Sequence, residues 1–153
     1  GAFDTFHFPD GMISQALVDN FGSEIDGSTG QNPGTDSPGA KLYQDMASAA
    51  DYDGTSPFSA EAYDAAALIL LAMQAAGSTD PAAYKDSVMD VANAPGEQIL
   101  PGELAKGLQI LKDGGDIDYV GASAVELIGP GESAGNYREV TFENGELVVV
   151  GYR

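Results

Sequence analysis

The stretch of residues 62–76 constrains the fold more than any other, because only two strongly polar side chains interrupt it. Its Ala, Leu and Met residues favour helix. Ser56, which precedes a proline, and Ser59 are alternative starting points for this helix, and Gly77 is a suitable end. The run is shorter than the roughly twenty residues needed to cross a bilayer. A helix that is apolar on nearly every side is normally covered on nearly every side, so we predict a core helix that the rest of the chain covers.

The balance of charges argues against a nucleic-acid partner. The 153 residues include 24 acidic side chains and 6 Lys and Arg, which gives a net charge of -18. Such a surface repels DNA, RNA and anionic lipid, since binding to these polyanions depends on Lys and Arg. The acid excess has two interpretations. It keeps the chain soluble, including in a salty environment, or it steers cationic ligands toward the surface.

The sequence contains no cysteine. Disulfides, zinc–thiolate sites and a cysteine nucleophile are therefore excluded, and the composition suits an exported protein. The length is enough for one ordinary domain with a core of its own. Because a strand-like apolar run, residues 3–8, begins almost at once, we expect the chain to be a fragment of a larger protein.

Helical periodicity dominates the middle of the chain, and strand-like alternation lies at its two ends. We predict helices over residues 12–21, 38–50, 80–92 and 103–112 besides the central one, and strands over residues 3–8, 25–29, 137–143 and 146–152. Residues 30–38 and 95–102 are predicted to be loops, and residues 117–123 to be short and irregular. Asn144-Gly145 between the last two strands is a strong hairpin signal, because both turn positions favour positive φ.

None of the familiar catalytic or metal-binding motifs is complete in this sequence. His7 is the only histidine and lies in an apolar strand, so we expect it in the core or on a cleft wall. Residues 51–54 resemble a calcium loop, but the glycine comes too early and Glu61 falls one residue short of the closing position. The Gly-rich residues 27–34 lack the lysine of a phosphate loop. We therefore expect no catalytic residue, no metal and no cofactor.

Asp10 is the one acidic residue whose position suggests a ligand site. It lies in Pro9-Asp10-Gly11, where a predicted strand ends and a predicted helix is about to begin. Ligands of open α/β sheets bind at such carboxyl ends of strands. The alternative is an acid that only stabilises the helix N-terminus through the macrodipole. The residues alone leave both interpretations open.

Several segments occur in an order and spacing that resemble a known family. They are Phe-Pro-Asp-Gly-Met at 8–12, Ser-Ala-Glu-Ala-Tyr-Asp-Ala at 59–65, the stretches 76–81 and 115–123, and the terminal hairpin 137–145. Together they are similar to the C-terminal half of a type I periplasmic-binding-fold protein of the branched-chain amino-acid (Leu/Ile/Val) type, the substrate-binding component of an ABC transporter. Residues 124–135 depart from the family pattern, because the family's Phe-Asp-x-x-Gly-Asp turn is rebuilt there.

The resemblance implies an α/β fold with two Rossmann-like lobes, of which this chain is the C-terminal portion. Residues 1–33 and 130–153 would belong to the second lobe, and residues 34–129 to the first. The missing N-terminal half of the same protein would then be a partner of this chain, since the central helix needs a sheet to cover.

The resemblance also implies a function. The chain would bind a small amino-acid-like ligand in a cleft between lobes by hinge closure, and would deliver it to an ABC permease. Asp10 would accept the ligand's α-ammonium group, and Phe58 would form an apolar wall. Such proteins are not enzymes, and they are periplasmic or otherwise exported. The alternative is a ligand-sensing receptor or regulatory domain of the same fold.

Overall fold

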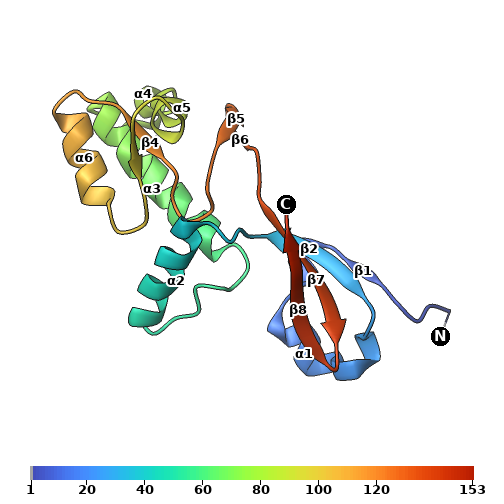
Figure 1. Cartoon of the computed structure of the whole chain (residues 1–153). Helices are drawn as coiled ribbons and strands as arrows, with labels where there is room; N and C mark the ends of the chain where they lie inside the picture. Colours follow the sequence, from blue (N-terminus) through green and yellow to red (C-terminus); the bar gives the residue numbers. More distant parts are fainter. Residues whose placement is uncertain (1) are drawn as a thin grey trace. The chain divides into compact units, whose positions relative to one another are not determined.

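The structure, a computed structural model, describes residues 2–153 and divides them into two compact units (Figure 1). Unit 1 contains the residues up to Thr35, the segment Ser56–Phe58 and the segment Asn136–Arg153. Unit 2 contains Asp36–Thr55 and Ser59–Gly135. The assignment of residues 1–33, 34–129 and 130–153 to the lobes of a larger protein stays a prediction.

Unit 1 is a mixed sheet covered on one face by short helices. The strand order is β1-β2-β7-β8, with β1 parallel to β2 and the other pairs antiparallel. Its elements are β1 (His7–Phe8), η1 (Asp10–Met12), α1 (Gln15–Phe21), η2 (Gly22–Ile25), β2 (Thr29–Pro33), β7 (Tyr137–Glu143) and β8 (Glu146–Tyr152). Its core contains the apolar side chains of Phe8, Ile13, Leu17, Val18, Ile25, Val140 and Phe142.

The β7–β8 hairpin confirms the prediction made from Asn144-Gly145. Asn144 and Gly145 both have positive φ, and Glu143 pairs with Glu146 across the turn. The carboxylate of Asp26 accepts hydrogen bonds from the backbone N–H of both turn residues, at 3.1 and 3.0 Å. The turn is therefore tied to the end of η2 as well as being locally favoured.

Unit 2 is helical, with a small parallel strand pair. Its elements are α2 (Pro38–Ala49), α3 (Ser59–Ala76), α4 (Pro81–Tyr84), α5 (Ser87–Ala92), β3 (Glu97–Ile99), α6 (Leu104–Lys112), β4 (Ile117–Tyr119), β5 (Leu127–Gly129) and β6 (Glu132–Ser133). β3 pairs with β4 in parallel, and α3 packs against α5 and α6 (Figure 1). The core contains Leu68, Leu71, Val91, Ile99, Ile117 and Tyr119 among others.

The central helix is confirmed as α3. The expectation that the rest of the chain covers it on nearly every side is wrong. Leu71 and Ala72 are fully buried, whereas Ile69 and Leu70 are exposed. The described part of the chain thus leaves this side of α3 only partly covered. At the observed length α3 still does not qualify as a membrane span: among the described residues no helix is long and apolar enough to cross a bilayer.

Some predicted elements have other boundaries in the structure. The strand expected at 25–29 lies at Thr29–Pro33, within the stretch predicted to be a loop, because pairing with β7 outweighs the poor strand preference of these residues. The 95–102 loop contains β3, since pairing with β4 orders it. The helix expected at 80–92 is divided into α4 and α5, and α5 packs on α3 with Val91 and Ala92 buried. The first strand is limited to His7–Phe8.

The loop after β4 is fastened to α3 by a buried carboxylate. Asp64 is 2% exposed. Its Oδ1 accepts hydrogen bonds from the Tyr119 hydroxyl and the Ala122 backbone N–H, both at 2.8 Å. Its Oδ2 accepts from the backbone N–H and the hydroxyl of Ser123, at 2.7 and 2.6 Å. Burial, and then the negative charge of Asp64, raise the pKa of Tyr119 far above its usual range.

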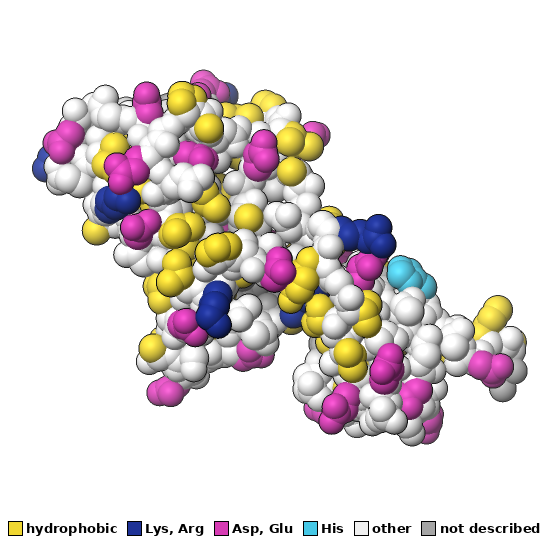
Figure 2. Space-filling view, in the orientation of Figure 1, with side chains coloured by type: hydrophobic (Ala, Val, Ile, Leu, Met, Phe, Trp, Pro, Cys, Tyr) yellow, Lys and Arg dark blue, Asp and Glu magenta, His cyan; other side chains and the backbone are white. Residues whose placement is uncertain are grey.

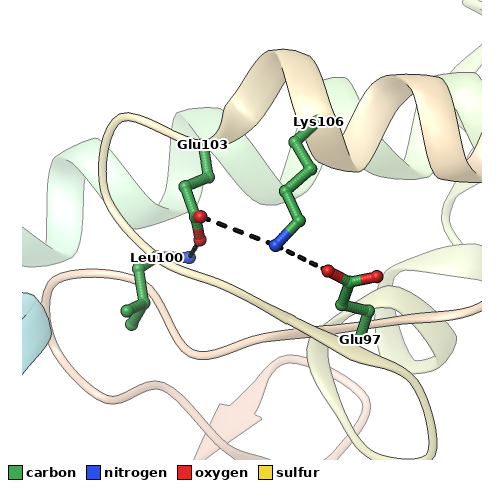
Figure 3. A network of polar contacts seen from close by, with 4 residues as sticks. All are labelled: Glu97, Leu100, Glu103 and Lys106. Carbon is green, nitrogen blue, oxygen red and sulfur yellow. Dashed lines mark hydrogen bonds and ion pairs between the residues drawn. The ribbon is translucent and has the colours of Figure 1, made fainter.

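A smaller polar network holds the start of α6 against β3 (Figure 3). The carboxylate of Glu103 accepts a hydrogen bond from the backbone N–H of Leu100 at 3.0 Å, and this bond is the main reason why the pKa of Glu103 is lowered. The ammonium of Lys106 lies 2.7 Å from a carboxylate oxygen of Glu97 and 3.5 Å from one of Glu103. The hydrogen bond with Glu97 is the main reason why the pKa of Lys106 is raised.

Candidate functional site

Asp10 lies where the sequence analysis expected it, directly after a strand. β1 ends at Phe8, Pro9 is extended, and Asp10 is the first residue of η1. The carboxylate Oδ1 of Asp10 accepts a hydrogen bond from the backbone N–H of Gly11 at 2.7 Å. This bond orients the carboxylate, whose residue is exposed. The side chain is therefore available for an ionic contact.

A glycine on the neighbouring strand allows η1 to lie close to β2. A Cβ on Gly30 would lie 2.6 Å from Cδ1 of Ile13 and 2.8 Å from the carbonyl oxygen of Phe8. Ile13, which follows η1, is almost fully buried, and η1 packs on β2. Close packing at Gly30 thus holds Asp10 at the carboxyl end of β1, and carboxyl ends of strands are where α/β folds bind ligands.

Phe58 has an unusual backbone for a bulky residue. Its φ is 64°, its side chain is 44% exposed, and it immediately precedes α3. Positive φ is uncommon and strained for an aromatic residue, and such strain is concentrated at functional sites. The segment Ser56–Phe58 belongs to unit 1, as Asp10 does. Within the described residues, the structure gives no direct contact between Phe58 and Asp10, so their joint role stays a prediction.

His7 is not a core histidine, and that part of the expectation is wrong. It is exposed on β1, and its ring Nδ1 lies 2.9 Å from the hydroxyl oxygen of Thr29 on β2. The alternation that buries Phe8 places His7 on the opposite face of the sheet.

Residues 51–54, which resemble a calcium loop, are explained by a local turn. The carboxylate of Asp53 accepts hydrogen bonds from the backbone N–H and the hydroxyl of Thr55, at 2.8 and 2.6 Å. This is the turn geometry that Asp commonly adopts. Across residues 2–153, no group of three or more His, Asp or Glu side chains is arranged to hold a metal ion.

The sequence did not predict one polar pair of unit 1, which joins β2 and β7. The Nε of Arg138 on β7 donates a hydrogen bond to Oδ1 of Asn32 on β2 at 2.7 Å. The two residues lie 106 positions apart, and neither belongs to a recognisable motif, so only the strand pairing reveals them.

Unit 1 also contains a small apolar pocket beside η1. It has a volume of about 300 Å³ and is lined by Phe6, Phe8, Met12, Leu17, Phe21, Glu24 and Ile25. Acidic side chains are spread over the visible face of both units, and basic ones are sparse (Figure 2). An exposed carboxylate in such surroundings favours a ligand with a positive charge.

The comparisons with known proteins show the fold. No family model matches the chain. The structure is similar to the crystal structure of a leucine-binding protein, LivK, from Thermotoga maritima, with a TM-score of 0.67 and 18% identity over 99% of this chain and 38% of that chain. The predicted type I periplasmic-binding fold is thereby confirmed, with this chain as a portion of it.

The sequence comparison found a substrate-binding protein. The chain is 30% identical, over 102 residues, to the chemotactic signal transduction system substrate-binding protein BasB of Halobacterium salinarum. The match covers 63% of this chain and 25% of the relative. The chain thus spans about a quarter of that protein's length.

Proposed function

We propose that the chain is part of a solute-binding protein that binds a small amino-acid-like ligand by hinge closure of two lobes and delivers it to an ABC importer. The type I periplasmic-binding fold supports this proposal, as do the descriptions of the two similar proteins as leucine-binding and substrate-binding. The observation that carries it is the position of Asp10, an exposed, oriented carboxylate at the carboxyl end of β1, which pairs in parallel with β2. Closure would follow from tighter ligand binding to the closed state than to the open state.

Asp10 would accept the α-ammonium group of the ligand. A carboxylate facing an ammonium forms a charge-assisted hydrogen bond, which is stronger than a neutral one. An analogue without the amine leaves the carboxylate unpaired, so the site would discriminate against it. Phe58 would supply an apolar wall, and its strained backbone agrees with a side chain held for binding.

The proposed partners are the permease in the membrane and the upstream half of the same protein, with the whole in the periplasm or otherwise exported. Exposed apolar side chains support the upstream partner. Ile69 and Leu70 on α3 and Phe6 and Phe21 in unit 1 are all exposed. A three-layer α/β fold would cover such faces. A binding role, in place of catalysis, agrees with the binding-protein description of the structural neighbour.

A thermal-shift panel tests the ligand class. The chain, and any longer natural polypeptide that contains it, is heated with α-amino acids, the corresponding deaminated acids and simple amides. A ligand that binds only the folded state raises the melting midpoint. We expect α-amino acids to stabilise the wild type and Asp4→Asn, an exposed acid outside the site, but not Asp10→Asn. Stabilisation by the deaminated acids alone would exclude Asp10 as the ammonium partner.

Phe58 is tested by comparing Phe58→Ala with Phe58→Asn. Both variants lose the ring, so we expect both to bind the ligand more weakly. Asn tolerates positive φ better than Ala does, so the Asn variant should be the more stable of the two. Unchanged affinity in both variants would remove Phe58 from the site.

A second candidate function is ligand sensing. The similarity to a substrate-binding protein of chemotactic signal transduction favours it. Deletion of the protein distinguishes the two functions. If uptake of the stabilising ligand is lost, the transport proposal stands. If the swimming response to that ligand is lost while uptake persists, the protein is a sensor.

A further inference from the structure

Two of the connections between the units join neighbouring strands of unit 1; the others flank the short segment Ser56–Phe58. The chain passes to unit 2 after Thr35, just beyond β2, and returns at Asn136, just before β7. β2 and β7 are paired along their length, and the backbone N–H of Gly34 donates to the carbonyl of Asn136 at 3.0 Å. The two connections are thus held side by side at the point where they depart from unit 1.

A side-chain pair, with Asn32 buried and Arg138 half-buried, joins these strands close to both connections. Asn32 and Arg138 are register partners in the ladder, and Nε of Arg138 donates to Oδ1 of Asn32 at 2.7 Å. A Cβ on Gly34 would lie only 3.2 Å from Cδ of Arg138, so the arginine side chain runs across the backbone at residue 34. Glycine at 34 therefore lets the arginine stem lie flat against the departing strand.

The side-chain amide of Asn32 lacks one hydrogen bond. Asn32 is fully buried, yet its Nδ2 has no hydrogen-bond partner. The orientation of the amide is fixed, because the opposite orientation would point Nδ2 at the Nε donor of Arg138. A buried donor without a partner is unfavourable, so such a group in a native structure calls for an explanation.

We propose that Asn32 and Arg138 form a hinge clamp, a pair that keeps β2 and β7 in register where the chain leaves unit 1 and so limits how freely unit 2 reorients. The clamp residues position the hinge and do not contact the ligand. This inference deepens the proposed function, because ligand binding by closure requires a hinge with few accessible orientations. The unpaired Nδ2 donor of Asn32 is unfavourable, and the hydrogen bond between Oδ1 of Asn32 and Arg138 offsets this cost.

The absence of cysteine allows a direct test with two spin labels, one on each unit. Glu143→Cys in unit 1 and Lys112→Cys in unit 2 are both exposed sites. The distribution of label–label distances, measured by pulsed electron resonance on the chain without ligand, reports the range of orientations. We expect Asn32→Leu, which removes the acceptor, to broaden the distribution or to increase a minor population severalfold.

Two variants make this result specific. Asn32→Asp keeps the acceptor, adds a charge opposite Arg138 and removes the unpaired donor, so we expect it to retain the wild-type distribution. Gln31→Leu is the matched control: it removes an exposed 3.3 Å hydrogen bond to Glu139 between the same two strands, and we expect no broadening. If Asn32→Leu does not fold, Arg138→Lys keeps the charge but lacks Nε, and it should broaden the distribution instead.

An unchanged distribution in folded Asn32→Leu, or equal broadening by Gln31→Leu, overturns the clamp. Because the measurement needs no ligand, its failure is distinct from failure of the proposed function, which the thermal-shift panel detects. Broadening in Asn32→Leu without any ligand response in the panel would retain the clamp and overturn the binding proposal.

Discussion

The carboxylate of Asp64 accepts both the backbone N–H and the hydroxyl hydrogen bond of Ser123, at 2.7 and 2.6 Å. The two residues lie 59 positions apart. The buried face of α3 thus contains one acidic side chain among apolar ones, and that carboxylate fixes the loop that follows β4. The polar interruption in the central run is therefore part of the packing of unit 2.

Replacing this carboxylate should destabilise unit 2 strongly. Asp64→Asn keeps the shape but turns an amide toward groups that all donate hydrogen bonds. We expect a loss of roughly 2–4 kcal/mol in the free energy of unfolding, because buried donors lose their acceptor. Urea unfolding measures this, with Asp45→Asn, an exposed acid on α2, as the control that changes stability by less than about 0.5 kcal/mol. Equal effects of the two changes would contradict the structural role of Asp64.

The tyrosine that bonds to Asp64 predicts a loss of stability at alkaline pH. The pKa of Tyr119 in the folded chain is raised, chiefly by burial, whereas the unfolded chain releases this proton near pH 10. Above that pH the native state binds one more proton than the unfolded state, so stability falls as pH rises, by about 1.4 kcal/mol per pH unit. Tyr119→Phe removes this contribution. We expect the variant to be less stable at pH 7, and its urea midpoint to fall less steeply between about pH 10 and 11; parallel curves would contradict the assignment.

The close approach at Gly30 can be tested within one segment. Gly30→Ala places a methyl group against Ile13 and the Phe8 carbonyl, so we expect a loss of about 1–3 kcal/mol. Gly11→Ala is the control, since a Cβ there meets nothing within 4 Å. If the position of Asp10 depends on this packing, Gly30→Ala also weakens α-amino-acid binding beyond what its stability loss explains. A stable, normally binding Gly30→Ala variant would show that η1 does not need the glycine.

Salt should stabilise the chain. A net charge of -18 repels itself in the compact state, and the Debye length falls from about 30 Å at 0.01 M to about 3 Å at 1 M. We therefore expect the urea midpoint to rise with sodium chloride over this range. Sucrose, which is excluded from the surface but does not screen charge, serves as the comparison. A midpoint that responds to sucrose but not to salt would show that the acidic surface has no electrostatic cost.

The sequence predicted those parts of the fold that local chemistry decides. α3, the β7–β8 hairpin and the helix from Pro38 are determined by their own residues: an apolar run, a turn that favours positive φ, and the Ser37 cap, whose hydroxyl accepts from Ala40 at 3.1 Å. β2 could not be predicted, because Thr-Gly-Gln-Asn-Pro has little strand preference and becomes a strand only between β1 and β7.

The candidate site likewise contains features that local residues decide and features that strand pairing decides. Asp10 was predicted from its place after a strand, together with the family resemblance, and the structure confirms that place without testing its role. The Gly30 contact and the Asn32–Arg138 pair depend on which strands are neighbours. No periodicity within a single segment contains that information.

The strand order of unit 1 also has a consequence for biosynthesis. β7 and β8 are translated after unit 2, and without β7 the strand β2 has no antiparallel partner. The whole of unit 2 is translated between β2 and β7. Because chains fold as they emerge, N-terminal parts first, unit 2 can become compact on the ribosome while the earlier segments of unit 1 wait. Within this stretch of the protein, β1 and β2 thus complete their folding only after β7 has been made, and they are the segments that a chaperone would have to shield longest.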